Sequence, residues 1–200
     1  PVTLDDMVYH CRAVSRGLGR AHLVGDLPFM TYKVSPEQAL TAAARLVQDG
    51  GAESGKLEGG VEMAEPIAKI VTAGIPVVGH IGLTPQTASA LGGFKMQGRD
   101  AAAAKRIIED ARALEDAGVF SIILEAVPAP LGKLVAESVQ VPVIGIGAPI
   151  AFFLPRAAAM INARAILPEH ADVANAVGPI VGIVQAGRVD QIHWDAVNLK

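Results

Sequence analysis

The sequence predicts an α/β protein built on a parallel sheet, and three features lead to that fold class. Short apolar runs alternate with longer amphipathic segments, which is typical of β-α units and not of an antiparallel sandwich. The amphipathic segments carry helix-capping signals, and each apolar run ends in an ionisable residue or a glycine turn. With 200 residues, 51% of them hydrophobic, the chain is long enough to bury a substantial core.

The predicted helices follow from their caps and from the spacing of their apolar residues. The first covers residues 3–17 and opens with a Thr-x-x-Asp capping box. The second follows Ser35, which precedes a proline and a capping-box glutamine, and it ends before Gly50. Two further helices are expected over 62–73 and 100–117, each followed by a glycine that can end a helix.

Apolar runs between these helices are the predicted strands. Each of the first four leads into an ionisable side chain, at Asp26, Glu58, His80 and Glu125. Because parallel strands place their carboxyl ends at one rim, we expect these four side chains to meet there in a site. The alternative is that the charged residues only mark the points where strands leave the core. The five predicted strands cover 21–25, 55–57, 76–79, 120–124 and 141–146.

The residue types at this rim favour metal-assisted chemistry, and a 2-oxo acid is one substrate class that can supply the further oxygen ligands. Asp26 and Glu58 offer the carboxylate oxygens that Mg²⁺ prefers, and the substrate would complete the coordination. Lys56 shares a strand face with Glu58 and can hold a substrate carboxylate. Glu125, which apolar residues surround, is the candidate general base for proton removal beside the keto group. His80 is a candidate substrate contact, and its alternative is a structural histidine.

Charge and composition favour a small-molecule partner. The net charge of −3 gives nucleic acid or an anionic membrane little to bind. The longest uncharged stretch, 138–155, is broken by prolines and glycines, so no membrane-spanning helix is expected. Cys11 is the single cysteine, and the chain opens without a signal-like segment, which favours the cytoplasm. The glycine-rich segment 81–99 is expected to be a mobile active-site cover or a plain surface loop.

Several blocks of the sequence follow one another in a fixed order through residue 148. They read PVTLDDM, DLPFM, KLEGG, GHIGLTPQ, LE followed by VP, and IGIGA. These blocks resemble those of the ketopantoate hydroxymethyltransferase family, whose reaction is that of a 3-methyl-2-oxobutanoate hydroxymethyltransferase. The resemblance implies a partial (β/α)₈ TIM barrel of the phosphoenolpyruvate mutase and isocitrate lyase type. It also implies Mg²⁺ as the metal, 3-methyl-2-oxobutanoate as substrate, 5,10-methylenetetrahydrofolate as one-carbon donor and 2-dehydropantoate, a pantothenate precursor, as product. By the same resemblance, Asp26 and Glu58 are metal ligands, Lys56 and His80 contact substrate, and Glu125 is the base.

The sequence departs from this family in two places. It begins after the family's Gly-Asp-Ser segment, which provides another metal-site carboxylate, so we expect impaired activity. The tail, 149–200, diverges and resembles the carboxyl-terminal part of the hydantoinase/oxoprolinase family. Helical spacing from Glu169 to Val184 predicts a mainly helical tail that packs on, or extends, the incomplete barrel of residues 1–148.

Three other functions stay open at this point. An incomplete barrel has open sheet edges, which favours a homo-oligomer and allows an inactive fragment or fusion with only a structural role. Another Mg²⁺-dependent enzyme that forms an enolate from a 2-oxo acid would use the same rim. An amidohydrolase of the hydantoinase type rests on the tail alone and is the weakest of the three.

Overall fold

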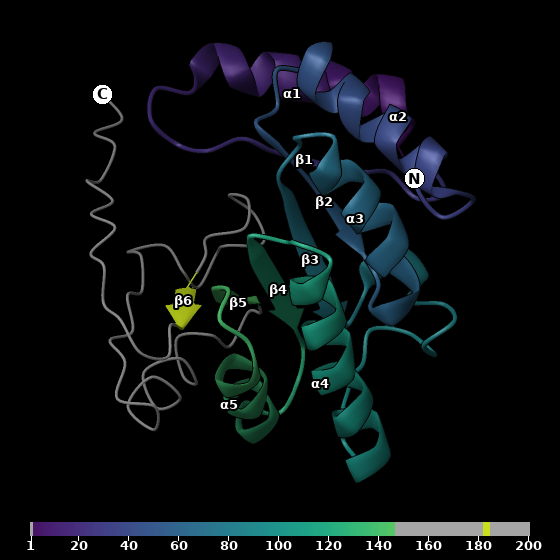
Figure 1. The fold of residues 1–200 in the computed structure, drawn as a ribbon, viewed down its shortest axis with the longest axis vertical. Helices are drawn as coiled ribbons and strands as arrows, with labels where there is room; N and C mark the ends of the chain where they lie inside the picture. The colour runs from purple at the N-terminus through teal and green to yellow at the C-terminus, as the bar shows by residue number, and fades with distance from the viewer. Residues whose placement is uncertain (1, 147–181, 185–200) are drawn as a thin grey trace.

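A sheet of six strands forms the centre of the structure, a computed structural model that describes residues 2–146 and 182–184 (Figure 1). The first five strands pair in parallel and in chain order, and the sixth pairs antiparallel with the fifth. This confirms the predicted α/β class with a parallel sheet. The strands are β1 (Val24–Asp26), β2 (Ser54–Glu58), β3 (Val77–Gly82), β4 (Ser121–Glu125), β5 (Val143–Ile146) and β6 (Gly182–Val184).

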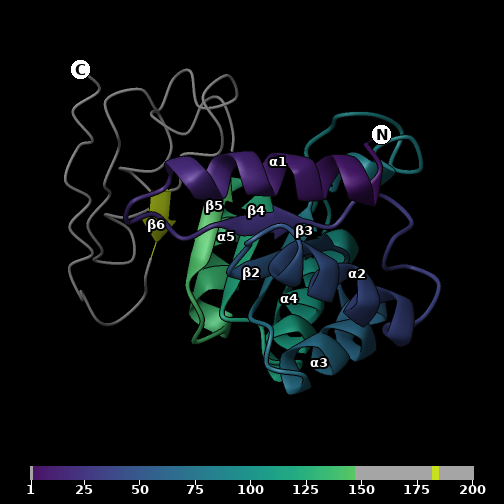
Figure 2. The ribbon, with the colours of Figure 1, turned by 90° about the horizontal axis from the view of Figure 1, so that it is seen from above.

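Helices α2 to α5 follow one another along one face of this sheet (Figures 1 and 2). Helix α1 packs beside α2 at the β1 end. Each of α2 to α5 lies between two consecutive strands in the chain, as β-α units require. The helices are α1 (Leu4–Gly17), α2 (Pro36–Gln48), α3 (Ala64–Thr72), α4 (Ala101–Asp116) and α5 (Ala129–Ser138), with single 3₁₀ turns at η1 (Val61–Met63) and η2 (Pro85–Thr87).

The predicted helix caps are present. The hydroxyl of Thr3 accepts the N–H of Asp6, whose carboxylate accepts the N–H of Thr3 in return, and this completes a capping box. Ser35 accepts the N–H of Gln38 in the same way at the start of α2. Each cap satisfies backbone donors that a helix start leaves unpaired, which typically stabilises a helix by about 1 kcal/mol.

Alternate residues of each strand face the helices. Leu57, Ile81, Ile122 and Leu124 are at most 5% exposed and belong to one apolar core with α2 to α5. Their neighbours in the sequence point to the opposite face, because successive strand residues alternate between the two faces of a sheet. One face of the sheet therefore builds the core, and the other is free to carry polar side chains.

The observed elements differ from the predicted ones at several boundaries. Strand β3 continues to Gly82, so His80 lies inside a strand and not just after one, because Ile81 and Gly82 still pair with β4. Helix α5 was not predicted, since Pro130 and Gly132 in its first turns are poor helix formers. Pro130 is tolerated there because the first turn of a helix has no acceptor for its missing N–H.

Part of the tail contradicts the predicted helix. Gly182–Val184 form strand β6 beside β5, although Val184 was placed on a helical pattern. Pairing with an exposed strand edge outweighs the weak helical spacing there, which Gly178 and Pro179 already interrupt. The rest of the tail and the expected domain boundary at residue 148 lie outside the described residues.

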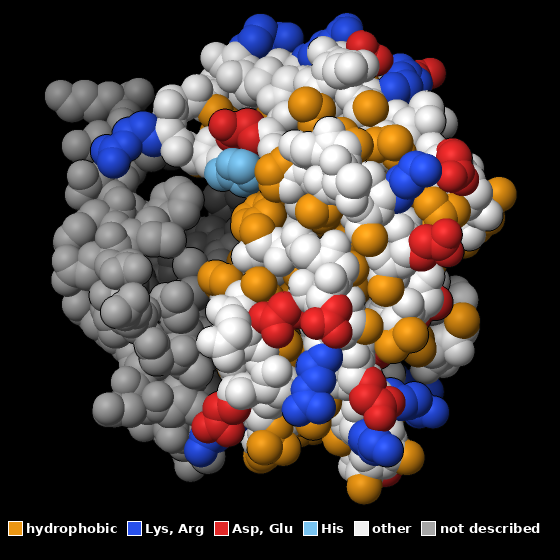
Figure 3. Space-filling view, viewed as in Figure 1, with side chains coloured by type: hydrophobic (Ala, Val, Ile, Leu, Met, Phe, Trp, Pro, Cys, Tyr) orange, Lys and Arg blue, Asp and Glu red, His pale blue; other side chains and the backbone are white. Residues whose placement is uncertain are grey.

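Charged side chains of both signs occur on the face of the molecule drawn in Figure 3. Figure 3 shows Lys and Arg side chains mixed with Asp and Glu side chains, without a large field of either sign on this face. Among the described residues, no helix has the length and apolarity needed to cross a membrane.

Candidate active site

All five predicted site residues lie at the carboxyl end of the parallel sheet, on the face opposite the helices. They form a continuous row across four strands. Lys56 Nζ lies 2.8 Å from Oδ1 of Asp26 and 4.0 Å from Oε1 of Glu58. His80 Nδ1 lies 3.7 Å from Oε1 of Glu58, and His80 Nε2 lies 3.1 Å from Oε2 of Glu125. The structure thus brings together every side chain that the sequence singled out.

Strand register accounts for this row. Asp26 pairs with Lys56 across β1 and β2, and Glu58 pairs with His80 across β2 and β3. Glu125 pairs with Gly82, two residues after His80, so it shares the face of the histidine. Gly82 has a φ of 88°, and a Cβ there would lie 2.3 Å from the carbonyl oxygen of Glu125. A glycine is therefore required at the point where the backbones of β3 and β4 approach.

Glu58 is the most buried member of the row. Its side chain is 3% exposed, against 15% for Lys56 and 22% for Glu125. Burial raises the pKa of the Glu58 carboxyl, while the nearby Lys56 and His80 act in the opposite direction. The Gln86 backbone N–H donates to Oε2 of Glu58 at 3.0 Å. The opposite oxygen, Oε1, is left facing Lys56 and His80.

Three buried polar atoms of the row lack aligned hydrogen bonds. Oδ1 of Asp26 and both ring nitrogens of His80 have no such partner in the described part of the chain, although charged atoms lie close to them. Buried polar atoms are rarely left in this condition, and they are more common at functional sites than elsewhere. The arrangement is therefore suited to taking up additional atoms, from a ligand or an ion.

The carboxylates of Asp26 and Glu58 match the chemistry of a Mg²⁺ site but do not complete one. Magnesium is commonly held by one or two carboxylates, with waters and substrate oxygens as the other ligands. Among the described residues, no group of three or more His, Cys, Asp or Glu side chains is placed to hold a metal. Any such site would thus depend on oxygens from the substrate or water.

Three residues near the row were missed by the sequence reasoning. Tyr32 is fully buried, and its hydroxyl accepts the backbone N–H of Glu58 at 3.2 Å. Lys33 Nζ donates to the Glu58 carbonyl at 3.2 Å and lies 5.0 Å from the centroid of the Tyr32 ring. Gln86 belongs to η2, where the sequence predicted only a loop. These residues lie outside the strands, so the strand-end pattern could not find them, and Lys33 was a lone cation without a motif.

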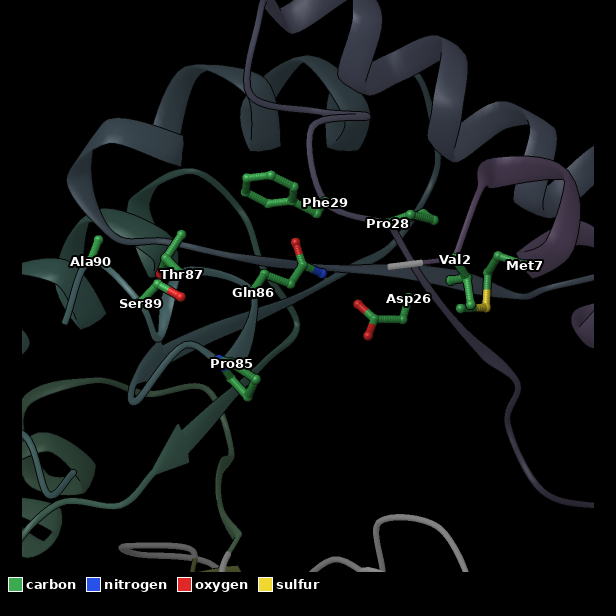
Figure 4. Close-up of a pocket in the computed structure, with 10 residues that line it drawn as sticks. All are labelled: Val2, Met7, Asp26, Pro28, Phe29, Pro85, Gln86, Thr87, Ser89 and Ala90. Carbon is green, nitrogen blue, oxygen red and sulfur yellow. The ribbon is translucent and has the colours of Figure 1, made fainter. Parts of the chain in front are cut away.

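A cavity of about 620 Å³ opens beside Asp26. Figure 4 shows the Asp26 carboxylate and the Gln86 carboxamide on its wall, with Phe29 at one side and Met7 at the other. Most of the lining is apolar, and the Phe29 ring is partly exposed. Pockets of this size and character are typical of small-molecule sites.

The predicted active-site cover is partly fixed to the site. Its first turn, η2, supplies Gln86, and near its end Gln97 donates its N–H to the carbonyl of Ala126, directly after Glu125. Phe94 and Met96, between these anchors, are 75% and 52% exposed. The segment therefore borders the row at both ends, and its mobility remains a prediction.

The fold and the row define an α/β protein with an ionisable site at the carboxyl ends of its parallel strands, where α/β proteins commonly keep their active sites. The family model for ketopantoate hydroxymethyltransferase matches residues 1–151. The chain belongs to this family.

Relatives with this activity in their names are closely similar in sequence. The 3-methyl-2-oxobutanoate hydroxymethyltransferase of Oleidesulfovibrio alaskensis is 60% identical over 147 residues, which are 74% of this chain and 51% of the relative. That of Thermoanaerobacter sp. strain X514 is 54% identical over 148 residues, 74% of this chain and 54% of the relative. The chain therefore spans about half the length of these relatives.

Solved structures support the fold alone. A Burkholderia cenocepacia J2315 protein assigned as a phosphonomutase has a TM-score of 0.60 at 17% identity, covering 78% of this chain and 67% of its own. A second protein from that organism, assigned as a lyase/mutase, has a TM-score of 0.52 at 20% identity, covering 72% of this chain and 52% of its own. Both agree with an α/β fold built on a parallel sheet.

Most of the tail lies beyond the family match. The family match ends at residue 151, and neither relative aligns over more than 148 residues. The resemblance of residues 149–200 to the hydantoinase/oxoprolinase family gains no support from them.

Proposed function

We propose that this chain transfers a hydroxymethyl group from 5,10-methylenetetrahydrofolate to 3-methyl-2-oxobutanoate and so forms 2-dehydropantoate. The observation that carries the proposal is the continuous row of five side chains, with the Asp26 carboxylate at one end and the Glu125 carboxylate at the other. In this row, the two carboxylates proposed to hold the metal, Asp26 and Glu58, lie on one side of His80. The carboxylate proposed to remove the proton, Glu125, lies on the other side. Such a separation is what deprotonation beside a keto group requires.

In this proposal, Asp26 and Glu58 would hold Mg²⁺, and oxygens of the substrate and of water would supply its other ligands. The bound cation would act as a Lewis acid that stabilises negative charge on the keto oxygen. The buried Oδ1 of Asp26, which lacks an aligned hydrogen bond, supports its assignment as a ligand. Oε1 of Glu58 is the second candidate donor, because Oε2 already accepts the N–H of Gln86.

Glu125 is proposed as the base that takes the proton from C3 of the substrate. It is the last residue of β4 and the more exposed of the two carboxylates beside His80, so a substrate can reach it. Once the proton is on Glu125, C3 forms the new carbon–carbon bond to the one-carbon unit. Both bonds between that unit and the two folate nitrogens break, and water provides the hydroxyl oxygen. One nitrogen takes the proton removed from C3 by way of Glu125, and the other takes the remaining proton of the water molecule.

Lys56 and His80 are the proposed substrate contacts. Lys56 is 15% exposed and its only close charge partners in the described residues are Asp26 and Glu58, which leaves ammonium protons for a substrate carboxylate. His80 lies between Glu58 and Glu125, where it can donate to the substrate or hold Glu125 in place. The cavity beside Asp26, with its apolar wall and Phe29 ring, is the proposed position of the one-carbon donor.

Assembly and location are further proposals. Within the described residues, β1 pairs with β2 and with no strand on its outer edge. An uncovered edge of this kind favours a homo-oligomer that covers it. The single cysteine, Cys11, is buried and free, which fits a reducing compartment such as the cytoplasm.

Exchange of the C3 proton tests the proposal directly. We expect the chain to replace the C3 proton of 3-methyl-2-oxobutanoate with deuterium only weakly, at a rate above that of the buffer but below that of a full-length relative, as followed by proton NMR. This activity should be lost when EDTA removes divalent cations. 3,3-Dimethyl-2-oxobutanoate has no C3 proton, and it should compete for binding without exchange. An inert structural role would instead give no exchange above the buffer rate, and exchange that EDTA leaves unchanged would argue against the metal.

A further inference from the structure

The ladder between β1 and β2 ends at an unusual rung. The last paired residues are Asp26 and Lys56, and the Leu27 N–H still donates to the Lys56 carbonyl at 2.9 Å. In a regular parallel ladder, the next bond would run from the Glu58 N–H to the Leu27 carbonyl. The chain turns away from β2 at Pro28, so the two groups of that rung need other partners.

Two side chains complete this rung. The Glu58 N–H donates to the Tyr32 hydroxyl at 3.2 Å, and that hydroxyl donates to Oε1 of Gln86 at 2.7 Å. Nε2 of Gln86 then donates to the Leu27 carbonyl at 2.9 Å. We refer to Tyr32 and Gln86, joined in this way, as the Tyr32–Gln86 bridge. It connects the residue after Asp26 with the backbone of Glu58.

The same bridge also orients the Glu58 carboxylate. The backbone N–H of Gln86 donates to Oε2 of Glu58 at 3.0 Å, which turns Oε1 toward Lys56 and His80. Tyr32 is fully buried, so its hydroxyl has no access to water as an alternative partner. The hydrogen bonds of Tyr32 and Gln86 therefore join the carboxyl end of β1, next to Asp26, to the carboxyl end of β2 at Glu58.

We propose that Tyr32 and Gln86 are positioning residues that fix the spacing of Asp26 and Glu58 for a divalent cation. The inference rests on the proposed function, in which those two carboxylates hold the cation. Neither side chain contacts the reacting atoms in this assignment. Loss of the bridge would free both strand ends, and the carboxylates would have to be reorganised each time a cation binds. Hydrogen-bonded partners of metal ligands typically change metal affinity by about 10- to 100-fold.

The test is binding of Mn²⁺ alone, measured by electron paramagnetic resonance on the full chain without substrate. Tyr32→Phe removes only the bridging hydroxyl, and we expect it to raise the Kd for Mn²⁺ about 10-fold or more. Thr31→Val is the matched control, since the Thr31 hydroxyl donates to the Pro28 carbonyl in the same loop and takes no part in the bridge. Its Kd should match that of the unmodified chain.

A second variant tests the same role in case Tyr32→Phe does not fold. Gln86→Met removes both carboxamide bonds but keeps the backbone N–H that donates to Glu58, and it should also weaken Mn²⁺ binding. Thermal unfolding of each variant separates positioning from stability. Lower melting temperatures with an unchanged Kd for both bridge variants would overturn the positioning role. If the unmodified chain bound Mn²⁺ no better than Glu58→Gln does, the metal site itself would be wrong and the positioning role with it.

Discussion

The imidazole of His80 lies between two carboxylates, 3.1 Å from Glu125 through Nε2 and 3.7 Å from Glu58 through Nδ1. A neutral imidazole carries a proton on one nitrogen only, so it can donate to one of these carboxylates at a time. Only the doubly protonated ring donates to both. His80 therefore links the position of the candidate base to that of a candidate metal ligand.

Glu125→Gln separates proton removal from binding. If Glu125 is the base, this variant should lower C3 proton exchange by about 10²- to 10⁴-fold, the usual contribution of a general base. Binding of 3-methyl-2-oxobutanoate, measured by calorimetry, should stay within a few-fold because the metal-site carboxylates are unchanged. Glu137→Gln, on the exposed face of α5, is the control. Exchange at the unmodified rate in Glu125→Gln would place the base elsewhere.

Lys56→Met should change cation binding and substrate binding in opposite directions. The Lys56 ammonium lies 2.8 Å from Asp26, so it opposes a divalent cation at that carboxylate. Its removal should tighten Mn²⁺ binding several-fold in the absence of substrate. Binding of the 2-oxo acid should weaken about 10-fold or more, since a charge-assisted hydrogen bond is lost. Lys105→Met, which removes an exposed lysine of α4, is the control. If Lys56→Met changed the affinities for Mn²⁺ and for the 2-oxo acid in the same direction, the assignment of Lys56 as a substrate contact would be contradicted.

Asp110→Asn should alter the pH dependence of stability. Burial raises the pKa of the Asp110 carboxyl, whose Oδ1 accepts the Val61 N–H at 3.0 Å. Between the unfolded and folded pKa values the folded state binds more protons, so the free energy of unfolding falls as pH rises through that window. Asparagine keeps the acceptor oxygen without a charge. Urea unfolding from about pH 4 to 7 should therefore show a smaller decline for Asp110→Asn, with Asp116→Asn as the exposed control. An unchanged pH profile would contradict this.

Ala126→Gly tests backbone strain next to the candidate base. Ala126 follows Glu125 with a φ of 49°, in the left-handed region that favours glycine. The left-handed conformation costs an alanine about 1–2 kcal/mol, and the greater chain entropy of glycine offsets part of the relief. We expect Ala126→Gly to raise the free energy of unfolding by up to about 1 kcal/mol. Ala129→Gly, in the helical backbone of α5, should lower it, and a loss of stability in both variants would show that strain is not the deciding factor.

Much of the fold and the row could be predicted from local sequence signals. Helix caps at Thr3 and Ser35 are read from adjacent residues, and the structure contains both. The ionisable residue after each apolar run locates Asp26, Glu58 and Glu125, because parallel strands share one rim. These features depend on a few neighbouring residues and on the single rule that the strands run in the same direction.

The features that were missed depend on contacts between distant segments. The Tyr32–Gln86 bridge joins residues that are 54 positions apart, and neither residue belongs to a periodic pattern. Helix α5 begins among prolines and a glycine, where local preference opposes a helix and packing of Leu131 and Val135 against the core stabilises it. The antiparallel pairing of β6 likewise depends on the exposed edge of β5 and not on its own three residues.

The alternation along β2 means that the row and the core are encoded in the same five residues. Lys56 and Glu58 face the rim, while Leu57 between them is fully buried against the helices. Insertion or deletion of one residue early in this strand would turn each later side chain to the opposite face of the sheet. The charged side chains of Lys56 and Glu58 would then point into the core, and Leu57 would point to the rim. Such a change would abolish folding and chemistry in one event. Length variation is instead open to the exposed stretch around Phe94, so variants that differ in length there can keep the same row unchanged.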